Sequence, residues 1–183
     1  MRIDRIILRN AVADDAEALS GFAARCFQQT FAAGNKPADM EDYLAKAFSP
    51  ATQSSEIADS AATIILAFDD RAADGQLVGY AHLICHEADV QLKRFYLVAS
   101  WQGSGLAALF IERIFEECRQ RGSGRLWLTV WTENDRAIAF YKKMGFRICG
   151  SETFMLGDDA QSDHVMEIAV SRSPPPTSTG AEP

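Results

Sequence analysis

The sequence predicts a single α+β domain in which helices flank a mixed, mostly antiparallel central sheet. The chain has 183 residues, enough for one domain with a substantial core. Its composition is 48% hydrophobic and 23% charged, as in ordinary globular proteins. The expected elements follow the order strand, two helices, three strands, helix, strand, helix, two strands. Because the strands occur in runs, this order favours an α+β fold.

A strand and a long helix are predicted at the start of the chain. Residues 3–9 form the expected strand. Apolar side chains then recur at helical spacing over residues 16–31, and Asp14 or Asp15 is the expected N-cap. Residues 32–35, with the sequence Ala-Ala-Gly-Asn, end this helix.

A second helix is predicted over residues 38–48, where apolar side chains again gather on one side. Ser49 and Pro50 end it, because the residue before a proline is disfavoured in helical conformation. Residues 51–60 are polar and are predicted to form a loop.

Three strands are predicted to follow the two helices. Residues 62–69 are apolar and β-branched, which favours a buried strand. The pair Asp74-Gly75 signals a turn before the next strand at residues 76–86. Residues 88–98 form the expected central strand, which leads into a loop with two glycines.

The second half of the chain alternates helices and strands and ends in a polar tail. The expected elements are a helix over 105–121 stopped by Gly122, a strand over 125–131, a helix over 133–144 closed by Gly145, and an antiparallel pair over 146–156 and 164–171. Residues 172–183 cannot bury apolar surface and are predicted to be a disordered tail. The predicted domain therefore spans residues 1–171.

Composition and charge argue against several classes of protein. The net charge of −7 and the isoelectric point of about 4.9 argue against a nucleic-acid-binding protein. No apolar run is long enough to span a membrane, and no secretory signal stands at the N-terminus. The four cysteines form no C-x-x-C pair, which fits reduced thiols in a cytoplasmic protein. The three histidines have no nearby cluster of ligands, so no metal site is expected.

The loop at residues 98–107 passes from a strand, through two glycines, into a helix. Exposed N–H groups at such a helix start bind phosphate, and Gly103 and Gly105 permit positive φ and close approach of a ligand. The loop also matches the G-x-G-x-x-A dinucleotide fingerprint, which would indicate a nucleotide-dependent oxidoreductase. That fingerprint belongs near the start of a parallel βαβ domain, whereas several antiparallel strands are expected before this loop. A purely structural strand-to-helix turn is a third interpretation.

Two blocks of sequence resemble the signatures of the GNAT acetyltransferases. Gln102-Gly103-Ser104-Gly105-Leu106-Ala107 resembles the signature Q/R-x-x-G-x-G/A, which holds the pyrophosphate of acetyl-CoA in that superfamily. Residues 134–146 resemble the signature N-x-x-A-x-x-F-Y-x-x-x-G-F, and residues 92–98 resemble the central strand. The resemblance covers roughly residues 5–170. It implies the GNAT fold and an N-acetyltransferase that moves an acetyl group from acetyl-CoA to a primary amine.

The resemblance also implies which residues would form the site. The expected acetyl-CoA contacts are Tyr96, Leu97, Val98, Gln102, Gly103, Ser104, Gly105, Leu106, Ala107, Asn134, Ala137 and Phe140. The central strand is expected to separate from its neighbour after Leu97 and Val98, where its backbone would pair with the pantetheine arm. Tyr141 is the expected general acid, because a phenol can donate a proton to the leaving thiolate. Without the resemblance, Tyr141 is a core aromatic residue and Asn134 a helix N-cap.

The general base is left open by the sequence. Many members of the family have a glutamate in the central strand at the place of Gln91, and an amide cannot accept the proton. Asp89, Glu87 or His86 could act through water, or water alone could remove the proton.

The acceptor is also left open. The aromatic first two helices resemble the branch of bacterial spermidine/spermine acetyltransferases. Acidic residues that could attract a polyamine-like amine in this region are Asp39, Glu41, Asp42, Glu56 and Asp59, although a solvated helix face has the same composition. A peptide or protein amine is the other expected acceptor, and a homodimer is compatible with the resemblance. The alternative function is a catalytically weak acyl-CoA-binding regulatory domain, which the amide of Gln91 would fit.

Overall fold

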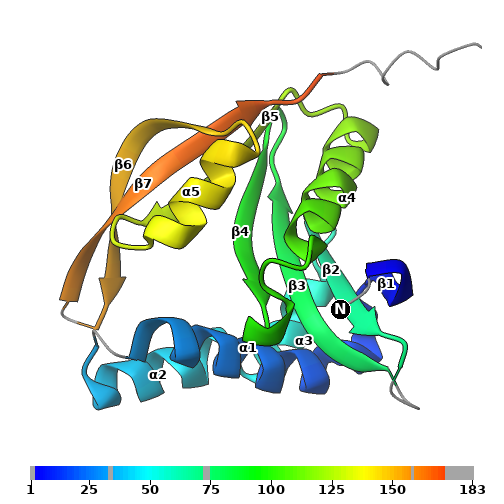
Figure 1. Cartoon of the computed structure of the whole chain (residues 1–183). Coiled ribbons are helices and arrows are strands. Elements are labelled where there is room, and N and C mark those ends of the chain that lie inside the picture. The colour runs from blue at the N-terminus through cyan, green and yellow to red at the C-terminus, as the bar shows by residue number, and fades with distance from the viewer. Residues whose placement is uncertain (1–2, 33–34, 72–74, 158, 172–183) are drawn as a thin grey trace, which may run out of the picture.

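The computed structural model describes residues 3–32, 35–71, 75–157 and 159–171 (Figure 1). The strands are β1 (Ile6–Asn10), β2 (Ala62–Asp69), β3 (Gln76–Cys85), β4 (Val90–Leu97), β5 (Arg125–Trp131), β6 (Arg147–Leu156) and β7 (Asp159–Ala169). The helices are α1 (Ala16–Phe31), α2 (Pro37–Ala47), α3 (Pro50–Ala58), α4 (Leu106–Gln120) and α5 (Asp135–Lys143), with 3-10 turns η1 (Ile3–Arg5), η2 (Ala13–Asp15) and η4 (Ala99–Trp101). The predicted α+β class is confirmed, and the predicted order of elements is confirmed except for one additional helix, α3.

One seven-stranded sheet has the strand order β1-β2-β3-β4-β5-β7-β6. Its neighbouring strands run antiparallel except for β4 and β5, which run parallel. The loop with two glycines therefore follows four strands of an antiparallel meander. This topology contradicts the dinucleotide-binding interpretation, because that fingerprint requires a parallel βαβ unit.

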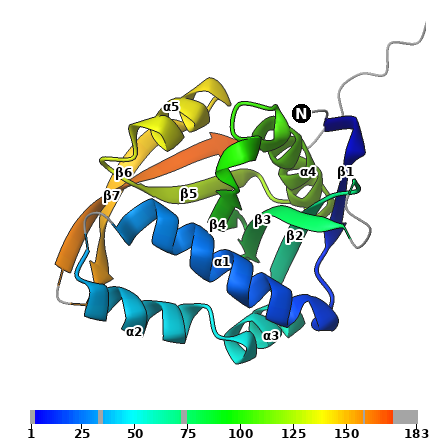
Figure 2. The same cartoon turned by 60° about the horizontal axis from the view of Figure 1, so that its bottom comes forward.

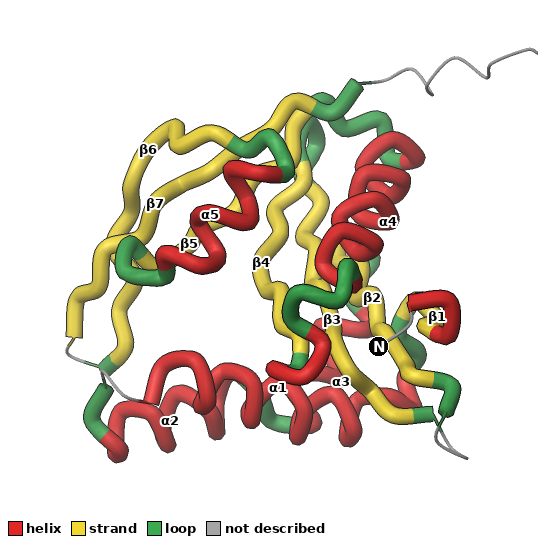
Figure 3. The backbone as a smooth tube through the Cα atoms, viewed as in Figure 1, coloured by secondary structure: helices red, strands yellow, loops and turns green. Residues whose placement is uncertain are grey.

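The helices cover the two faces of the sheet (Figures 2 and 3). On one face, α4 and α5 pack through Phe110, Ile114 and Ile138 in a cluster with the inner side chains of β2 to β5. On the other face, α1 and α2 pack through Leu19 and Met40 in a second cluster. The helical spacing of the apolar residues in α1 is confirmed, because these side chains are buried.

β4 and β5 separate close to the start of β4. Their register contains two pairs, Val90 with Leu126 and Gln91 with Trp127. Beyond Gln91 the two strands diverge, as Figures 1 and 3 show. The prediction that the central strand separates after Leu97 and Val98 is therefore wrong. The separation begins at Leu92, so that almost the whole of β4 has an edge without a strand beside it.

Residues 51–60 are largely helical, not a loop as predicted. α3 occupies Pro50–Ala58, and the Ser49 hydroxyl accepts a hydrogen bond from the Thr52 N–H at 3.1 Å. Ser49 and Pro50 therefore begin a new helix as well as ending α2, because serine is a good N-cap and proline fits the first helical position. Tertiary packing then stabilises this short polar helix, since Ile57 packs against the second cluster and the Gln53 side-chain N–H donates to the Ala47 carbonyl at 3.1 Å.

The predicted N-cap of α1 is right in position and wrong in mechanism. Asp15 precedes the helix but makes no capping hydrogen bond to it. Its carboxylate instead accepts two hydrogen bonds from the Arg9 guanidinium, at 2.6 and 2.7 Å, and one from the Val12 N–H at 2.8 Å. A bidentate guanidinium contact is stronger than a neutral cap, and it fastens the end of β1 to the start of α1.

The remaining differences concern boundaries. The first strand begins at Ile6 because residues 3–5 form the turn η1, and the last strand begins at Asp159 rather than at residue 164. Pairing with β6 extends the last strand across polar residues that have no strand pattern of their own. The expected tail at 172–183 and Asp74 of the expected turn lie outside the described residues. Among those residues, no helix has both the length and the apolar character needed to cross a membrane.

Candidate active site

The loop between β4 and α4 leads into a helix start, where the first backbone N–H groups have no partner within the helix. Gly103 has φ of +74° and Gly105 has φ of +95°, both in the left-handed region that the sequence predicts. A Cβ atom on Gly103 would meet no other atom within 4 Å, so space lies open beside the main chain. The Ser104 hydroxyl accepts a hydrogen bond from the Leu106 N–H at 3.3 Å and donates one to the Trp101 carbonyl at 2.6 Å. A pyrophosphate fits this arrangement of a helix N-terminus and an accessible backbone.

The edge of β4 lies beside this loop. On its other side, β4 pairs with β3 as far as Leu97, and the Val98 N–H donates to the Val78 carbonyl at 3.0 Å. Antiparallel pairing uses alternate backbone groups of a strand, so that the other groups face the gap toward β5. An extended ligand such as a pantetheine arm can pair with these groups as an added strand does.

α5 contributes two predicted site residues from the second sequence block. The Asn134 side chain accepts a hydrogen bond from the Ala137 N–H at 3.2 Å, which confirms that it is the N-cap of α5. Tyr141 is 8% exposed, and its ring centroid lies 5.4 Å from those of Phe140 and Phe146. Burial raises the pKa of the Tyr141 phenol above its ordinary value. The hydroxyl therefore keeps its proton at neutral pH.

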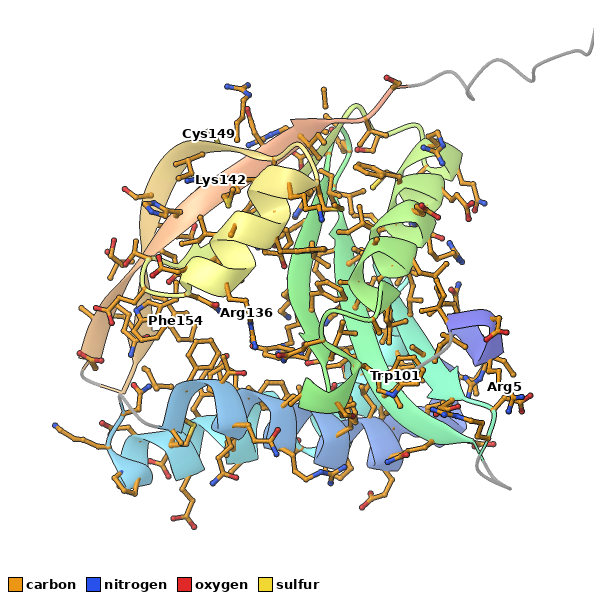
Figure 4. All side chains as sticks on the ribbon, viewed as in Figure 1. Arg5, Trp101, Arg136, Lys142, Cys149 and Phe154 are labelled. Atoms are coloured by element: carbon orange, nitrogen blue, oxygen red, sulfur yellow. The ribbon has the colours of Figure 1, made fainter. Side chains whose placement is uncertain are left out.

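A cavity of about 590 Å³ lies between the glycine loop, the end of β4 and the start of α5. We call it the loop cavity; its walls include Tyr96, Leu97, Gln102, Asn134, Arg136 and Ala137. Arg136, labelled in Figure 4, reaches from α5 toward the loop, where its guanidinium donates to the Gln102 side-chain carbonyl. A guanidinium at this position adds positive charge to a site already suited to phosphate.

A second cavity of about 310 Å³ lies between α1, α2 and the second half of the sheet. We call it the aromatic cavity; the rings that line it include Phe27, Phe31, Tyr43, Phe48, Trp131 and Phe154. These rings contact one another around the cavity. Ring centroids lie 4.7 Å apart for Phe27 and Tyr43 and 6.1 Å apart for Phe31 and Trp131. Tyr43 also lies 5.8 Å from Phe154, which is labelled on β6 in Figure 4.

The two cavities share a wall. Residues that line both are Thr30, Phe95, Tyr96, Trp131, Asn134 and Ala137. Tyr141 lines the aromatic cavity although its helix covers the opposite face of the sheet. The separation of β4 and β5 opens this path between the two faces.

Two carboxylates line the aromatic cavity at the β6–β7 hairpin. The backbone register places Trp131 opposite Asp163, and Asp163 opposite Glu152. Asp163 is 9% exposed, and burial followed by the charge of Glu152 raises its pKa above the ordinary value. Sequence analysis missed both residues, because the register of three strands that brings them together is not visible in any local pattern.

The acidic residue Glu56, predicted to attract a cationic acceptor, has another role. Its carboxylate accepts hydrogen bonds from Arg94 at 2.6 Å and Lys93 at 2.9 Å, and it lies 3.6 Å from the buried His82. The nearby cations hold the pKa of Glu56 below its ordinary value despite the opposing effect of burial. Glu56 thus compensates the positive charges of β4. The prediction that Glu56 offers a free negative charge to the acceptor is wrong.

The structure brings together five of the twelve predicted acetyl-CoA contacts in one cavity. Tyr96, Leu97, Gln102, Asn134 and Ala137 line the loop cavity, and Tyr141 lines the aromatic cavity. The other predicted contacts lie outside the lining of both cavities, in the loop, beside β4 or on α5: Val98, Gly103, Ser104, Gly105, Leu106, Ala107 and Phe140. Leu106 can meet a ligand only through its main chain, as its side chain is fully buried.

The candidates for a general base do not gather at the site. Asp89 accepts hydrogen bonds from Arg125 at 3.2 Å and from the Trp127 indole at 3.1 Å. Neither Asp89 nor its neighbours Glu87 and His86 line the two cavities, whereas Gln91 lines the aromatic cavity. Within the described ranges, no group of three or more His, Cys, Asp and Glu side chains is arranged to hold a metal ion.

Comparisons with known proteins agree with this geometry. The sequence matches the Acetyltransferase (GNAT) family over residues 14–146. An uncharacterised N-acetyltransferase of Mycobacterium tuberculosis is 34% identical over 153 residues, which cover 83% of this chain and 96% of the relative. The streptothricin acetyltransferase of Streptomyces lavendulae is 28% identical over 101 residues, which cover 54% of this chain and 53% of the relative.

Among solved structures, the PaiA N-acetyltransferase of Thermoplasma acidophilum, in complex with coenzyme A, has a TM-score of 0.76. It is 23% identical to this chain, and the match covers 90% of this chain and 98% of that one. The likeness concerns the fold. The family match, the full-length relative and the loop that fits a pyrophosphate lead to one identification: the chain belongs to the GNAT acetyltransferases and is an acetyl-CoA-dependent N-acetyltransferase.

Proposed function

We propose that the protein transfers the acetyl group of acetyl-CoA to a primary amine of a small, positively charged acceptor. The observation that carries this proposal is the common wall of the two cavities. Acetyl-CoA occupies the loop cavity, the acceptor occupies the aromatic cavity, and the two meet beside Tyr141. The ring faces of the aromatic cavity favour a cationic acceptor, because the face of an aromatic ring attracts positive charge.

In this proposal the donor is held mainly by backbone. Residues 102–107 meet the pyrophosphate at the start of α4, and the free edge of β4 at residues 96–98 pairs with the pantetheine arm. The Asn134 amide nitrogen remains available to the arm while its oxygen caps α5. Ala137 and Phe140 complete the predicted contacts from the side of α5. Arg136, which the sequence did not suggest, adds a charged contact to the phosphates.

The reaction forms a C–N bond and breaks a C–S bond. The neutral amine attacks the carbonyl carbon of the thioester, and the electron pair of the C–S bond leaves with the sulfur. The amine loses one proton and the sulfur gains one. We propose that the Tyr141 hydroxyl donates the proton that the sulfur gains. Burial keeps this hydroxyl protonated at neutral pH. The hydroxyl recovers a proton from water after the thiol leaves.

Water removes the proton of the amine in this proposal. Gln91 lines the cavity at the place where other members of the family have a glutamate, and an amide cannot act as a base. Asp89 is held by Arg125 and Trp127 outside the cavity. We therefore expect that replacing Asp89 with asparagine, or Glu87 with glutamine, leaves acetyl transfer intact.

A screen of amines with detection of free CoA tests the proposal. It includes aliphatic monoamines and diamines, streptothricin, and peptides with a free N-terminus or a lysine. We expect turnover with at least one small cationic amine, and none without protein. Turnover of peptides alone would contradict the small-acceptor proposal.

The alternative is a catalytically weak domain that binds acyl-CoA and regulates a partner, which the amide of Gln91 favours. A thermal-shift titration with acetyl-CoA measures binding separately from turnover. A ligand at 100 times its Kd stabilises the folded state by about 2.7 kcal/mol. Stabilisation by acetyl-CoA together with no turnover in the complete screen would support the regulatory alternative.

A further inference from the structure

The β6–β7 hairpin brings an aromatic ring and two carboxylates into one row across the sheet. Trp131 of β5, Asp163 of β7 and Glu152 of β6 are directly opposite one another in the backbone register. Side chains of such partners lie on the same face and touch. All three line the aromatic cavity. The row therefore faces the cavity in which we propose that the acceptor binds, as well as bulk solvent.

Asp163 has no partner that explains its burial. Its side chain makes no hydrogen bond and no ion pair within the described part of the chain, although the residue is 9% exposed. A carboxylate with so little exposure to water is costly unless a cation or hydrogen-bond donor compensates it. The neighbouring Glu152 makes the cost greater, because it adds a second negative charge. Burial, followed by the charge of Glu152, raises the pKa of Asp163, and the neighbouring His164 opposes this increase only in part.

The positive residues of the same cavity do not compensate this pair. Arg94 and Lys93 both donate to Glu56, and the Arg94 guanidinium also lies over the Phe48 ring, 4.8 Å from its centroid. The two cations therefore already interact with Glu56 and Phe48. The negative charge on the hairpin is left for a ligand.

We propose that Asp163 and Glu152 form a subsite for a second positive charge of the acceptor, separate from the amine that is acetylated. The preferred acceptor is then an aliphatic amine with a further ammonium group, whose hydrocarbon chain lies against the rings of the cavity. Trp131 contributes its ring face to the same ammonium. This inference rests on the proposed function and assigns the residues that select the acceptor.

The test compares a diamine with a monoamine of similar length, 1,5-diaminopentane and hexylamine. For the unaltered protein we expect kcat/KM to be at least about tenfold higher for the diamine. Asp163→Asn keeps the shape and removes the charge, so it should abolish this preference by raising KM for the diamine, with hexylamine unaffected. Glu152→Gln should act in the same direction. Glu112→Gln, an exposed carboxylate on α4 outside both cavities, is the control for net charge.

Two results would overturn the subsite. One is an unaltered protein that acetylates both amines equally well. The other is a loss of kcat for both amines in Asp163→Asn, which would place the carboxylate at the reacting amine. If no amine is acetylated, the proposed function fails separately. Calorimetry of the two amines with the CoA-bound protein then tests the subsite, which predicts that Asp163→Asn weakens binding of the diamine alone.

Discussion

At the scale of single residues, Tyr141 belongs both to the core and to the candidate site. Its ring packs between Phe140 and Phe146, while the residue lines the aromatic cavity beside Asn134. The two roles use different atoms, because the ring supplies apolar surface and the hydroxyl, in the proposed mechanism, supplies a proton. The two sequence-level interpretations of this residue are therefore compatible. A substitution that removes the hydroxyl alone separates them.

Tyr141→Phe is expected to lower kcat by about 10²-fold, within the usual range for general acid–base catalysis. KM for acetyl-CoA should change little, because the lost interaction belongs to the transition state. The free energy of unfolding should fall by no more than about 1.5 kcal/mol, the value of one hydrogen bond. Steady-state kinetics and urea unfolding of this variant measure the three quantities. A variant with unaltered kcat at saturating substrates would mean that the proton comes from elsewhere.

Gly103→Val is expected to weaken acetyl-CoA binding by about tenfold or more, because the side chain occupies the space where the pyrophosphate meets the main chain. Gly122→Val is a matched control, since Gly122 has a similar φ of +69°, compared with +74° for Gly103, and equally open surroundings. Both variants carry the same backbone strain of about 1–2 kcal/mol. Calorimetry with acetyl-CoA should separate them. Equal affinities in the two variants would contradict the assignment of the loop to the pyrophosphate.

At the scale of elements, α3 and the strands β3 and β4 are joined by a buried polar network. His82 on β3 is fully buried beside Glu56 of α3 and Arg94 of β4. Burial lowers the pKa of His82 to about 4, and the attraction of Glu56 only partly opposes this effect. The imidazole is therefore neutral in the folded protein at neutral pH. The network fixes α3 against the sheet and shapes one wall of the aromatic cavity.

His82 should make the folded state lose stability as the pH falls from about 6.5 to about 4. In this window the unfolded chain protonates the imidazole and the folded protein does not, so protons favour unfolding. The full effect is about 3 kcal/mol from the difference between the two pKa values. The lowered pKa of Glu56 contributes separately, with stability lost below about pH 4.5.

Urea unfolding at a series of pH values from 7.5 to about 4 measures the effect of His82. His82→Gln removes the titrating group and keeps a polar side chain. We expect the slope of stability against pH between about 6.5 and 4.5 to be clearly smaller in this variant. Identical slopes would show that other groups cause the loss in acid.

At the scale of the whole molecule, the sheet consists of two parts that meet at a short contact. β4 and β5 pair at Val90 and Gln91 and then diverge. At the other end, Arg136 of α5 donates to Gln102 of the loop and spans the gap. Acetyl-CoA in the loop cavity would touch both parts at once. Binding of acetyl-CoA should therefore depend on contacts that span the gap between the two parts of the sheet.

Arg136→Gln is expected to raise KM for acetyl-CoA by about tenfold with little change in kcat, because a charged contact to phosphate acts before the chemical step. Arg136→Lys keeps the positive charge and loses the planar guanidinium, which can donate two hydrogen bonds to one phosphate. Its KM for acetyl-CoA should lie between those of the unaltered protein and the Arg136→Gln variant. The difference in KM between the unaltered protein and the Arg136→Gln variant should shrink at high salt, since screening weakens an exposed charge contact. Kinetics at about 0.05 and 0.5 M salt check this expectation. A KM unaffected by the loss of Arg136 would remove it from the phosphate site.

Local patterns in the sequence were sufficient for the type and order of most elements and for the local geometry of the proposed donor half of the site. The glycine loop, the N-cap at Asn134 and the helix that carries Tyr141 each lie within about a dozen consecutive residues. Propensity, capping and periodicity act over that range, so these features follow from the order of the amino acids alone. The same information failed at α3, where the local start signal at Ser49 and Pro50 is joined by packing of Ile57 against the core, which no local pattern shows.

The acceptor half depends on contacts between residues far apart in the sequence, and tertiary structure alone decided it. The register of β5, β7 and β6 places Trp131, Asp163 and Glu152 in one row, and a shift of one residue would turn them to the other face. The fold also brings Glu56 to Arg94 and leaves Asp163 without a partner among the described residues. The sequence by itself therefore determined the family, and from the family came the prediction of how acetyl-CoA is held. The arrangement of charges around the acceptor required the packed structure, because strand register and burial are properties of the whole sheet.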